Sequence, residues 1–308
     1  MQLLVLGAGG IGGYFGGRLA HAGVDVRFLV RPTRAQSLLQ HGLVIKSPMG
    51  DLRTSVQVLT EVGSSFDAVL LACKAYDLDN AIEAIAPAVG LSTLILPLLN
   101  GIRHLDVLDA RFGRERVLGG LCHIGVTVNG AGEIQHLDTL QRLALGARTP
   151  EQAGAAAALH KVVERGGFEP VLSEAIMQEM WEKFAFLATY AGMTTLMRAP
   201  IGAILSANDG ESIMREMLQE CTETAAANGH LPRPAAMKQM EGLLTDRRST
   251  GTSSMLRDIT RGGRTEHEHI LGDMLARART ARVPAPLLRV SLAHMQAYEA
   301  TRLPAAAS

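Results

Sequence analysis

The stretch LLVLGAGGIGGYFGGRLAHAG, residues 3–23, decides the fold of the N-terminal half of this chain. Leu3 to Leu6 predict a short strand, the glycines a turn, and the remainder a helix. Gly7, Gly9 and Gly12 form the pattern G-x-G-x-x-G where the strand meets the helix. The first glycine permits a tight turn, the second lets backbone N–H groups approach a pyrophosphate, and the third allows close packing of helix on strand. Together with the partial positive charge of the helix N-terminus, this pattern predicts a dinucleotide-binding site.

The end of the second predicted strand, VDVRFLVR, indicates which dinucleotide is bound. Sites for NAD usually place Asp or Glu here, where a carboxylate accepts hydrogen bonds from the ribose 2′-OH. This sequence instead continues as LVRPTR, with Arg31 and Arg34. Cations suit a 2′-phosphate, so NADP(H) is the expected cofactor. The alternative is that both arginines are solvated surface residues.

The N-terminal half continues with further strands. HGLVIKSP and LRTSVQVLT are expected to form a hairpin, and ERVLGGLCHIGVTV a later strand. The runs Ala68 to Cys73 and Leu94 to Leu99 are continuously apolar, which is typical of strands buried on both faces of a parallel sheet. Lys74 follows the first run and Asn100 the second. Because ligands bind at the carboxyl ends of strands in doubly wound sheets, both residues are expected to line the binding site.

Helical periodicity dominates the second half of the chain. Ser173 is expected to N-cap the first of these helices. We therefore predict an α/β Rossmann-like dinucleotide-binding domain over 1–172 and an all-α substrate domain over 173–308, with the active site in the cleft between them. The terminal PAAAS is expected to be disordered. The predicted helices cover 174–197, 209–229, 233–244, 253–260, 264–281 and 286–300.

One lysine stands out in the predicted helix EMWEKFAFLATYAGMTTLMR, residues 179–198. Lys183 is followed by fourteen residues without a charge. At helical spacing it shares a face with Met180, Leu187 and Ala191, so its ammonium falls in a stripe that is expected to be buried. Desolvation there would lower the lysine pKa toward the working pH. The alternative is a snorkelling lysine whose stem packs while its head reaches water.

The composition narrows the remaining possibilities. The 308 residues carry thirty Lys plus Arg against thirty Asp plus Glu, with 47% apolar residues, so neither nucleic acid nor a membrane is an expected partner. No positively charged leader precedes the first apolar run, and no run reaches a membrane-spanning length. Three widely separated cysteines fit a reducing compartment. The sequence thus predicts a soluble cytoplasmic protein with inert thiols at Cys73, Cys122 and Cys221.

The segment TEHEHILG raises the question of a metal site. Residues two apart on a helix point about 200° apart, so His267 and His269 cannot share an ion there. No further His or Cys lies at ligand spacing, and no metal is expected. The methionine-rich run SIMREMLQEC is interpreted as core or subunit interface, and exposed methionines on the later helices allow a homodimer.

Six segments occur along the chain in a characteristic order: GAGGIGGYFGGRLAHAG, LLACKAYD, LLNG, MWEKF, SSMLRDITRGGRTE and RVPAP. In this order they resemble the ketopantoate reductase (2-dehydropantoate 2-reductase) family, and the resemblance covers nearly the whole chain. It implies an NADPH-dependent reductase of 2-keto acids, with ketopantoate as the substrate and a place in pantothenate biosynthesis.

The resemblance also implies roles for single residues. Lys183 would be the general acid, and Glu266 would orient it or the product hydroxyl. Ser254 would bind the substrate carboxylate, and Asn100 would contact both substrate and cofactor. Read without the resemblance, Glu266 is a first-turn acid favoured by a helix dipole and Ser254 a helix N-cap. The residues implied to bind cofactor are Gly7, Gly9, Gly12, Arg31, Lys74 and Asn100.

The sequence departs from the family pattern at the substrate positions. Family members carry asparagines four and eight residues beyond the catalytic lysine, where this chain has Leu187 and Ala191. Leu99 replaces a glutamine, and the segment after Glu266 differs at His267, Glu268 and Leu271. These changes favour a paralogous reductase or dehydrogenase for a bulkier or less polar substrate as the alternative to a ketopantoate reductase. A redox-sensing, non-catalytic NADP-binding regulator is the third possibility.

Overall fold

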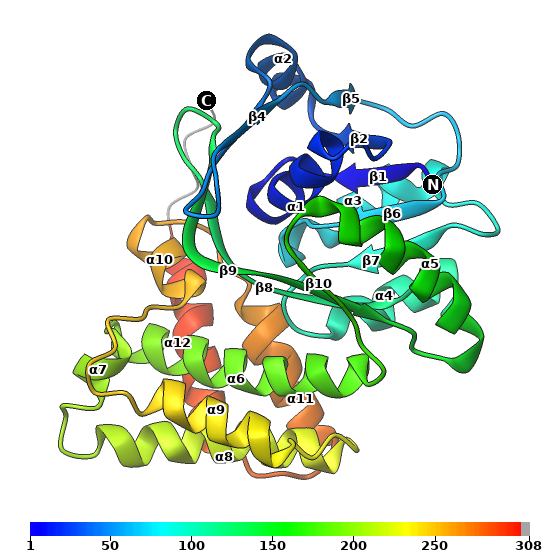
Figure 1. Cartoon of the computed structure of the whole chain (residues 1–308). Coiled ribbons are helices and arrows are strands. Elements are labelled where there is room, and N and C mark those ends of the chain that lie inside the picture. The colour runs from blue at the N-terminus through cyan, green and yellow to red at the C-terminus, as the bar shows by residue number, and fades with distance from the viewer. Residues whose placement is uncertain (303–308) are drawn as a thin grey trace. The chain divides into compact units, whose positions relative to one another are not determined.

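The computed structural model describes residues 1–302 (Figure 1). The predicted disordered tail, PAAAS, lies outside the described residues. The chain divides into two compact units. The first consists of Met1–Leu99 and His104–Met177, and the second of Asn100–Arg103 and Gln178–Ser308. Four residues from within the sequence of the first unit therefore belong by their contacts to the second.

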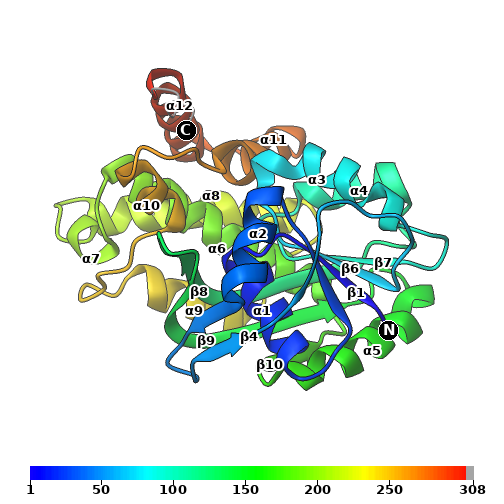
Figure 2. The ribbon, with the colours of Figure 1, turned by 90° about the horizontal axis from the view of Figure 1, so that it is seen from above.

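The first unit contains a parallel sheet in the order β5-β2-β1-β6-β7. Figure 2 shows β1, β6 and β7 next to one another. All residues of β6 and β7 are buried, as expected for strands with apolar side chains on both faces, and each strand ends two residues before the predicted limit. The strands are β1 (Leu3–Leu6), β2 (Val26–Leu29), β5 (Gln57–Leu59), β6 (Ala68–Leu71) and β7 (Leu94–Pro97).

A second sheet in the same unit has the order β10-β9-β3-β4, with β8 paired to β9. The predicted hairpin is confirmed where β3 pairs with β4 in antiparallel fashion. It is wrong for the end of that segment, because β5 pairs with β2 in the first sheet. The strands are β3 (Leu43–Lys46), β4 (Leu52–Thr54), β8 (Gly119–Val128), β9 (Ile134–Gly146) and β10 (Glu169–Leu172).

Helix α1 (Gly10–His21) lies between the two sheets, and its glycines explain how it fits. A Cβ on Gly16 would stand 2.8 Å from the Phe28 ring of the first sheet. A Cβ on Gly17, one residue on, would stand 2.5 Å from Leu43 of the second. Only hydrogen at these positions lets both sheets approach the helix. The other helices of this unit are α2 (Pro32–His41), α3 (Leu78–Ile85), α4 (Arg103–Phe112) and α5 (Ala153–Val163).

The second unit is helical. Its first helix begins at Ile176, two residues after the predicted start at Glu174. The Ser173 hydroxyl accepts a hydrogen bond from Ala175 N at 3.1 Å, just before this helix. The helices are α6 (Ile176–Met197), α7 (Ile201–Ile204), α8 (Gly210–Ala227), α9 (Pro234–Leu244), α10 (Ser254–Thr260), a π-helical turn (Glu268–Gly272), α11 (Asp273–Thr280) and α12 (Pro286–Thr301).

Buried polar contacts join these helices to one another. The Glu220 carboxylate of α8 accepts hydrogen bonds from the N–H groups of Leu287 and Leu288, both at 2.9 Å, and so caps α12. Glu182 of α6 pairs with Arg233 at the start of α9. The α6, α9 and α8 ribbons run along one another in Figure 1.

The methionine-rich run of α8 belongs to the core. Met214 and Met217 have no exposed surface, which decides between the two interpretations of this run in favour of core packing. A homodimer stays a prediction.

The architecture confirms the predicted fold class: an α/β unit with a parallel sheet, followed by a helical unit. Within residues 1–302, no helix is both long and apolar enough to cross a lipid bilayer.

Candidate functional site

The glycine turn after β1 is made for close approach to the main chain. Gly7 adopts a φ of +86°, a conformation that favours glycine, and its N–H donates to Leu29 O at 2.9 Å. Gly9 occupies the N-cap position of α1, and no atom lies within 4 Å of where its Cβ would be. Gly12 packs so tightly that a Cβ would overlap the carbonyl oxygen of Gly7. The three residues thus have three different reasons to be glycine.

This turn fits a dinucleotide pyrophosphate. The first turn of α1 contains no acidic residue, and no side chain caps its N–H groups. The space beside Gly9 leaves the backbone accessible to a ligand. A helix N-terminus with accessible N–H groups favours an anion.

Arg31 lies at the carboxyl edge of the parallel sheet, on the loop that follows β2. Its side chain is 84% exposed, and its guanidinium is 3.7 Å from the Asp77 carboxylate. Asp77 ends the short helical turn that begins after Lys74, on the loop that follows β6. Since β2 and β6 flank β1, the ion pair spans the carboxyl end of β1, next to the glycine turn. The structure therefore brings Arg31 and the Lys74 loop to the same edge of the sheet.

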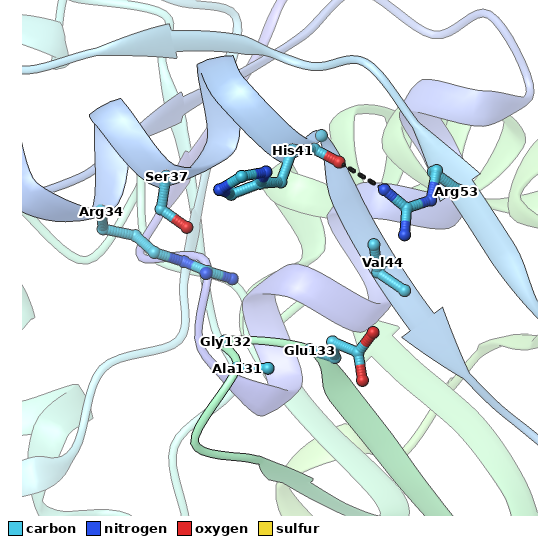
Figure 3. A pocket seen from close by; sticks show the side chains of 9 residues that line it. Arg34, Ser37, His41, Val44, Arg53, Ala131, Gly132 and Glu133 are labelled. Atoms are coloured by element: carbon cyan, nitrogen blue, oxygen red, sulfur yellow. Dashed lines mark hydrogen bonds between the residues drawn. The ribbon is translucent and has the colours of Figure 1, made fainter.

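Arg34 does not share this position. Its guanidinium donates to Ala8 O at 3.2 Å and projects into a pocket of about 280 Å³ between α2, the β3–β4 hairpin and the turn at Gly132 (Figure 3). Burial lowers the pKa of Arg34. Of the two arginines that the sequence places after β2, Arg34 braces the glycine turn, and Arg31 points to solvent.

On α6, the predicted apolar stripe is only partly buried. Ala191 is buried, with 4% of its surface exposed, and Met180 with 3%. Lys183 and Leu187, by contrast, are half-buried. The prediction of a uniformly buried stripe is therefore wrong. Lys183 is a half-buried position on an apolar helix, and the same face has the buried residues Met180 before it and Ala191 after it.

The start of α10 packs on this helix beyond Ala191. The Thr194 hydroxyl donates to Ser253 Oγ at 2.8 Å, and Ser253 Oγ in turn accepts from Leu256 N as the N-cap of α10. The N-cap is therefore Ser253, and the capping interpretation of Ser254 is wrong. Ser254 is the first residue of α10 and is half-buried.

Tyr190 contributes a second polar group near this position. Its phenolic oxygen is 2.9 Å from where a Cβ on Gly251 would stand, and burial raises its pKa while the charge of Arg257 lowers it. Nothing in the sequence singles out Tyr190 as a site residue, because a tyrosine in an apolar helix is an ordinary core residue.

Glu266 lies just before the π-helical turn. Its carbonyl accepts from His269 N and Ile270 N, at 3.0 and 3.1 Å, and it is 5% exposed. It therefore stands at the start of a helix, as the dipole interpretation expected, and it is also buried. The neighbouring His267 is held by Thr265 Oγ1, at 2.9 Å from Nδ1.

The loop after β7 brings Asn100 to the helical unit. Gly101 has a φ of +78°, and a Cβ on it would stand 3.1 Å from both Cδ2 and the carbonyl oxygen of His269. His269 is also hydrogen-bonded to the Asn100 backbone. Asn100, Glu266 and His269 therefore form one neighbourhood within the second unit. The sequence singled out His269 only as a metal candidate and missed this contact.

Within residues 1–302, no three His, Cys, Asp or Glu side chains come together as a potential metal site. Cys122 and Cys221 are buried and Cys73 is half-buried. Burial raises the pKa of Cys221 to about 12, which keeps it protonated.

Family models match both halves of the chain. Residues 3–150 match the model "Ketopantoate reductase PanE/ApbA", and residues 175–299 match its C-terminal counterpart. The Bacillus subtilis protein YkpB, an uncharacterized oxidoreductase by name, is 37% identical over 98% of this chain and all of its own length.

Solved structures share the whole fold. A 2-dehydropantoate 2-reductase from Methylococcus capsulatus is 28% identical, with a TM-score of 0.86 over 99% of both chains. A D-mandelate dehydrogenase in complex with NADH and anilino(oxo)acetate has a TM-score of 0.87 over 98% of this chain and 99% of its own. At 20% identity, this second likeness concerns the fold alone.

Proposed function

Because this chain belongs to the ketopantoate reductase PanE/ApbA family of oxidoreductases, we propose that it reduces a 2-keto acid to the 2-hydroxy acid with NADPH. The family's usual substrate, 2-dehydropantoate (ketopantoate), is the first candidate, and its reduction to pantoate would place the protein in pantothenate biosynthesis. The observation that carries the proposal is Lys183, a half-buried lysine on α6 that is followed by an uncharged stretch from residue 184 to residue 197.

The chemistry needs a cation at the keto oxygen. When the carbonyl carbon is reduced, negative charge develops on that oxygen, and an ammonium group there stabilises it and supplies the proton. We assign this role to Lys183. The helix around it is apolar, and an environment of lower dielectric than water would strengthen its interaction with the developing charge. Glu266 would orient the lysine or the product hydroxyl, Ser254 would bind the substrate carboxylate, and Asn100 would contact substrate and cofactor.

The cofactor is assigned to the first unit. Gly7, Gly9 and Gly12 would receive the pyrophosphate, and Arg31 with Lys74 would contact the 2′-phosphate. A bound NADPH supplies the hydride for the reaction. The preference for NADPH over NADH rests on Arg31, whose guanidinium already has the Asp77 carboxylate as a neighbour.

A second candidate substrate is favoured by two residues on α6. Leu187 and Ala191 replace amides of the family and offer no hydrogen bond to a polar substrate group. A substrate hydroxyl would lose its partner here, which selects against ketopantoate, whereas an apolar side chain would gain contact area. We therefore propose a 2-keto acid with a branched or aromatic side chain as the alternative substrate.

Steady-state kinetics test these proposals. NADPH oxidation should be followed with ketopantoate and with 2-keto acids that carry larger apolar groups. Turnover of any member supports the reductase, and the ratio of kcat/KM values identifies the substrate class. NADPH binding without turnover of any 2-keto acid would contradict the enzyme assignment and favour the redox-sensing regulator.

A further inference from the structure

His269 has no role in the proposed function, but it contacts the Asn100–Gly101 turn, and Asn100 is proposed to contact substrate and cofactor. We propose that His269 is a positioning residue: its imidazole N–H holds the Asn100 backbone and thereby orients the Asn100 amide for the substrate. The inference rests on the proposed function, since it gives Asn100 a substrate to contact.

The contact is specific in its geometry. The edge of the imidazole that carries Cδ2 and Nε2 faces Gly101, because a Cβ there would be 3.1 Å from Cδ2 and 3.5 Å from Nε2. The hydrogen bond with the Asn100 backbone favours the protonated ring, so the ring is the donor and a carbonyl the acceptor. Gly101 is at φ +78°, where glycine is favoured, and the helix lies too close for any side chain to fit without a shift.

The helix beneath the contact is also unusual. The Asp273 N–H bonds to Glu268 O, five residues earlier, which defines a π turn over Glu268–Gly272. Such turns are rare and change the direction of side chains relative to an α-helix. His269 lies inside this turn. Its side chain is buried and polar, and it contacts a tight turn of another segment. This combination fits a positioning role better than simple core packing.

Burial keeps the His269 ring neutral. Burial is the main cause that lowers the His269 pKa, to about 4. The negative charge of Glu266 raises it, and the positive charges of Arg103 and Arg277 lower it. At neutral pH the ring is therefore an uncharged donor. It can hold the Asn100 carbonyl without adding a second cation near a substrate that Lys183 is proposed to protonate.

The test is a double-mutant cycle between His269 and Asn100. His269→Phe keeps a ring of similar size and removes the donor, whereas His269→Gln places an amide N–H near the position of Nε2. We expect His269→Phe to lower kcat/KM for the best 2-keto acid by about 10-fold or more and His269→Gln to recover most of the loss. In an Asn100→Ala background, His269→Phe should have little further effect, because the group that it positions is gone.

Hydrogen exchange supplies a readout that needs no substrate. In full-length protein, amide exchange in the peptide that contains Asn100 and Gly101 should be faster in His269→Phe than in wild type or His269→Gln. His230→Phe is the matched control, because His230 stacks on Trp181 in the same unit with ring centroids 5.3 Å apart. It should leave both the exchange and kcat/KM unchanged.

The outcomes separate the two proposals. A wild-type protein that turns over no 2-keto acid, but whose exchange responds to His269→Phe as described, contradicts the proposed function and retains the contact. An active enzyme in which the effects of His269→Phe and Asn100→Ala are additive contradicts the positioning role. Unchanged exchange in His269→Phe also contradicts it, whatever the activity.

Discussion

At the glycine turn the open surface is main chain, whereas the partly exposed face of α6 is made of side chains. Gly7, Gly9 and Gly12 each satisfy a different backbone requirement, and the sequence follows the family pattern at all three. On α6, Lys183 follows the pattern, but Leu187 and Ala191 do not. A backbone site cannot change without refolding the turn, while a side-chain site can change one substitution at a time. On the proposed assignments, the residues that would bind cofactor follow the family pattern, and residues that would face the substrate depart from it.

The largest effect is expected at Lys183. Lys183→Met keeps an apolar stem of similar length and removes the ammonium, so kcat should fall by about 10²- to 10⁴-fold. NADPH affinity, measured by fluorescence titration, should stay nearly unchanged. Lys238→Ala, at an exposed lysine of α9, is the control. Near-normal turnover of Lys183→Met would show that Lys183 is not the proton donor.

The second effect is on stability as a function of pH. His269 has a folded pKa of about 4 against an ordinary value of 6.5, so the unfolded chain binds more protons between these two values. This contribution to stability is complete above about pH 6.5 and decreases by up to about 3 kcal/mol as the pH falls to about 4. Urea unfolding across this range should show a steeper pH dependence in wild type than in His269→Gln. Equal slopes would mean that His269 is not buried as a neutral ring.

The third effect concerns the backbone site. Gly12→Ala would push a methyl group into the Gly7 carbonyl, which is main chain and cannot rotate away. The free energy of unfolding should fall by about 1–3 kcal/mol, and NADPH binding should weaken as the turn opens. Gly154→Ala in α5 has open space around its Cβ and should be neutral or slightly stabilising. If the two variants behaved alike, the glycine turn would not be a backbone-defined site.

The fourth effect concerns the diverged face. Introducing asparagine at both Leu187 and Ala191 would restore the amides of the family on α6. We expect the kcat/KM ratio to move toward ketopantoate, relative to a larger apolar 2-keto acid, by about 10- to 100-fold. The buried position of Ala191 makes thermal unfolding of each single variant a necessary accompanying measurement. A ratio that does not change would show that these positions do not face the substrate.

The smallest effect is expected at the exposed pair beside the turn. Arg31→Ala should weaken NADPH binding by about 10-fold while leaving NADH binding nearly unchanged, because only the 2′-phosphate is lost as a partner. Asp77→Asn removes a competing carboxylate 3.7 Å from the guanidinium and should favour NADPH by about threefold or less. If Arg31→Ala weakened the binding of both cofactors equally, the residue would not read the 2′-phosphate.

The sequence was sufficient for features that depend on local pattern. The glycine spacing, the apolar strands and the helical periodicity predicted the fold class and most helices within a few residues. Periodicity could not reveal that β5 leaves the hairpin to pair with β2, because strand pairing depends on distant partners. Nor could it show the contact of Asn100–Arg103 with the helical unit, or the π turn at residues 268–272.

The sequence did not determine how the side chains of the candidate site are placed. Arg31 and Arg34 are equivalent in sequence, yet one is exposed beside Asp77 and the other braces Ala8 O. Ser253 and Ser254 are adjacent serines, and only the structure assigns the cap to the first. Each of these distinctions depends on side-chain direction, which composition and spacing do not determine.

The central claim is that the α6 face has diverged from the family, and substrate preference tests it most directly. With NADPH saturating, kcat/KM of the wild-type protein should be measured for a 2-keto acid with a bulky apolar side chain and for ketopantoate, and the first value divided by the second. Leu187 and Ala191 predict a ratio above one. A ratio far below one, with efficient turnover of ketopantoate, would contradict the divergence of the α6 face and identify the protein as an ordinary ketopantoate reductase.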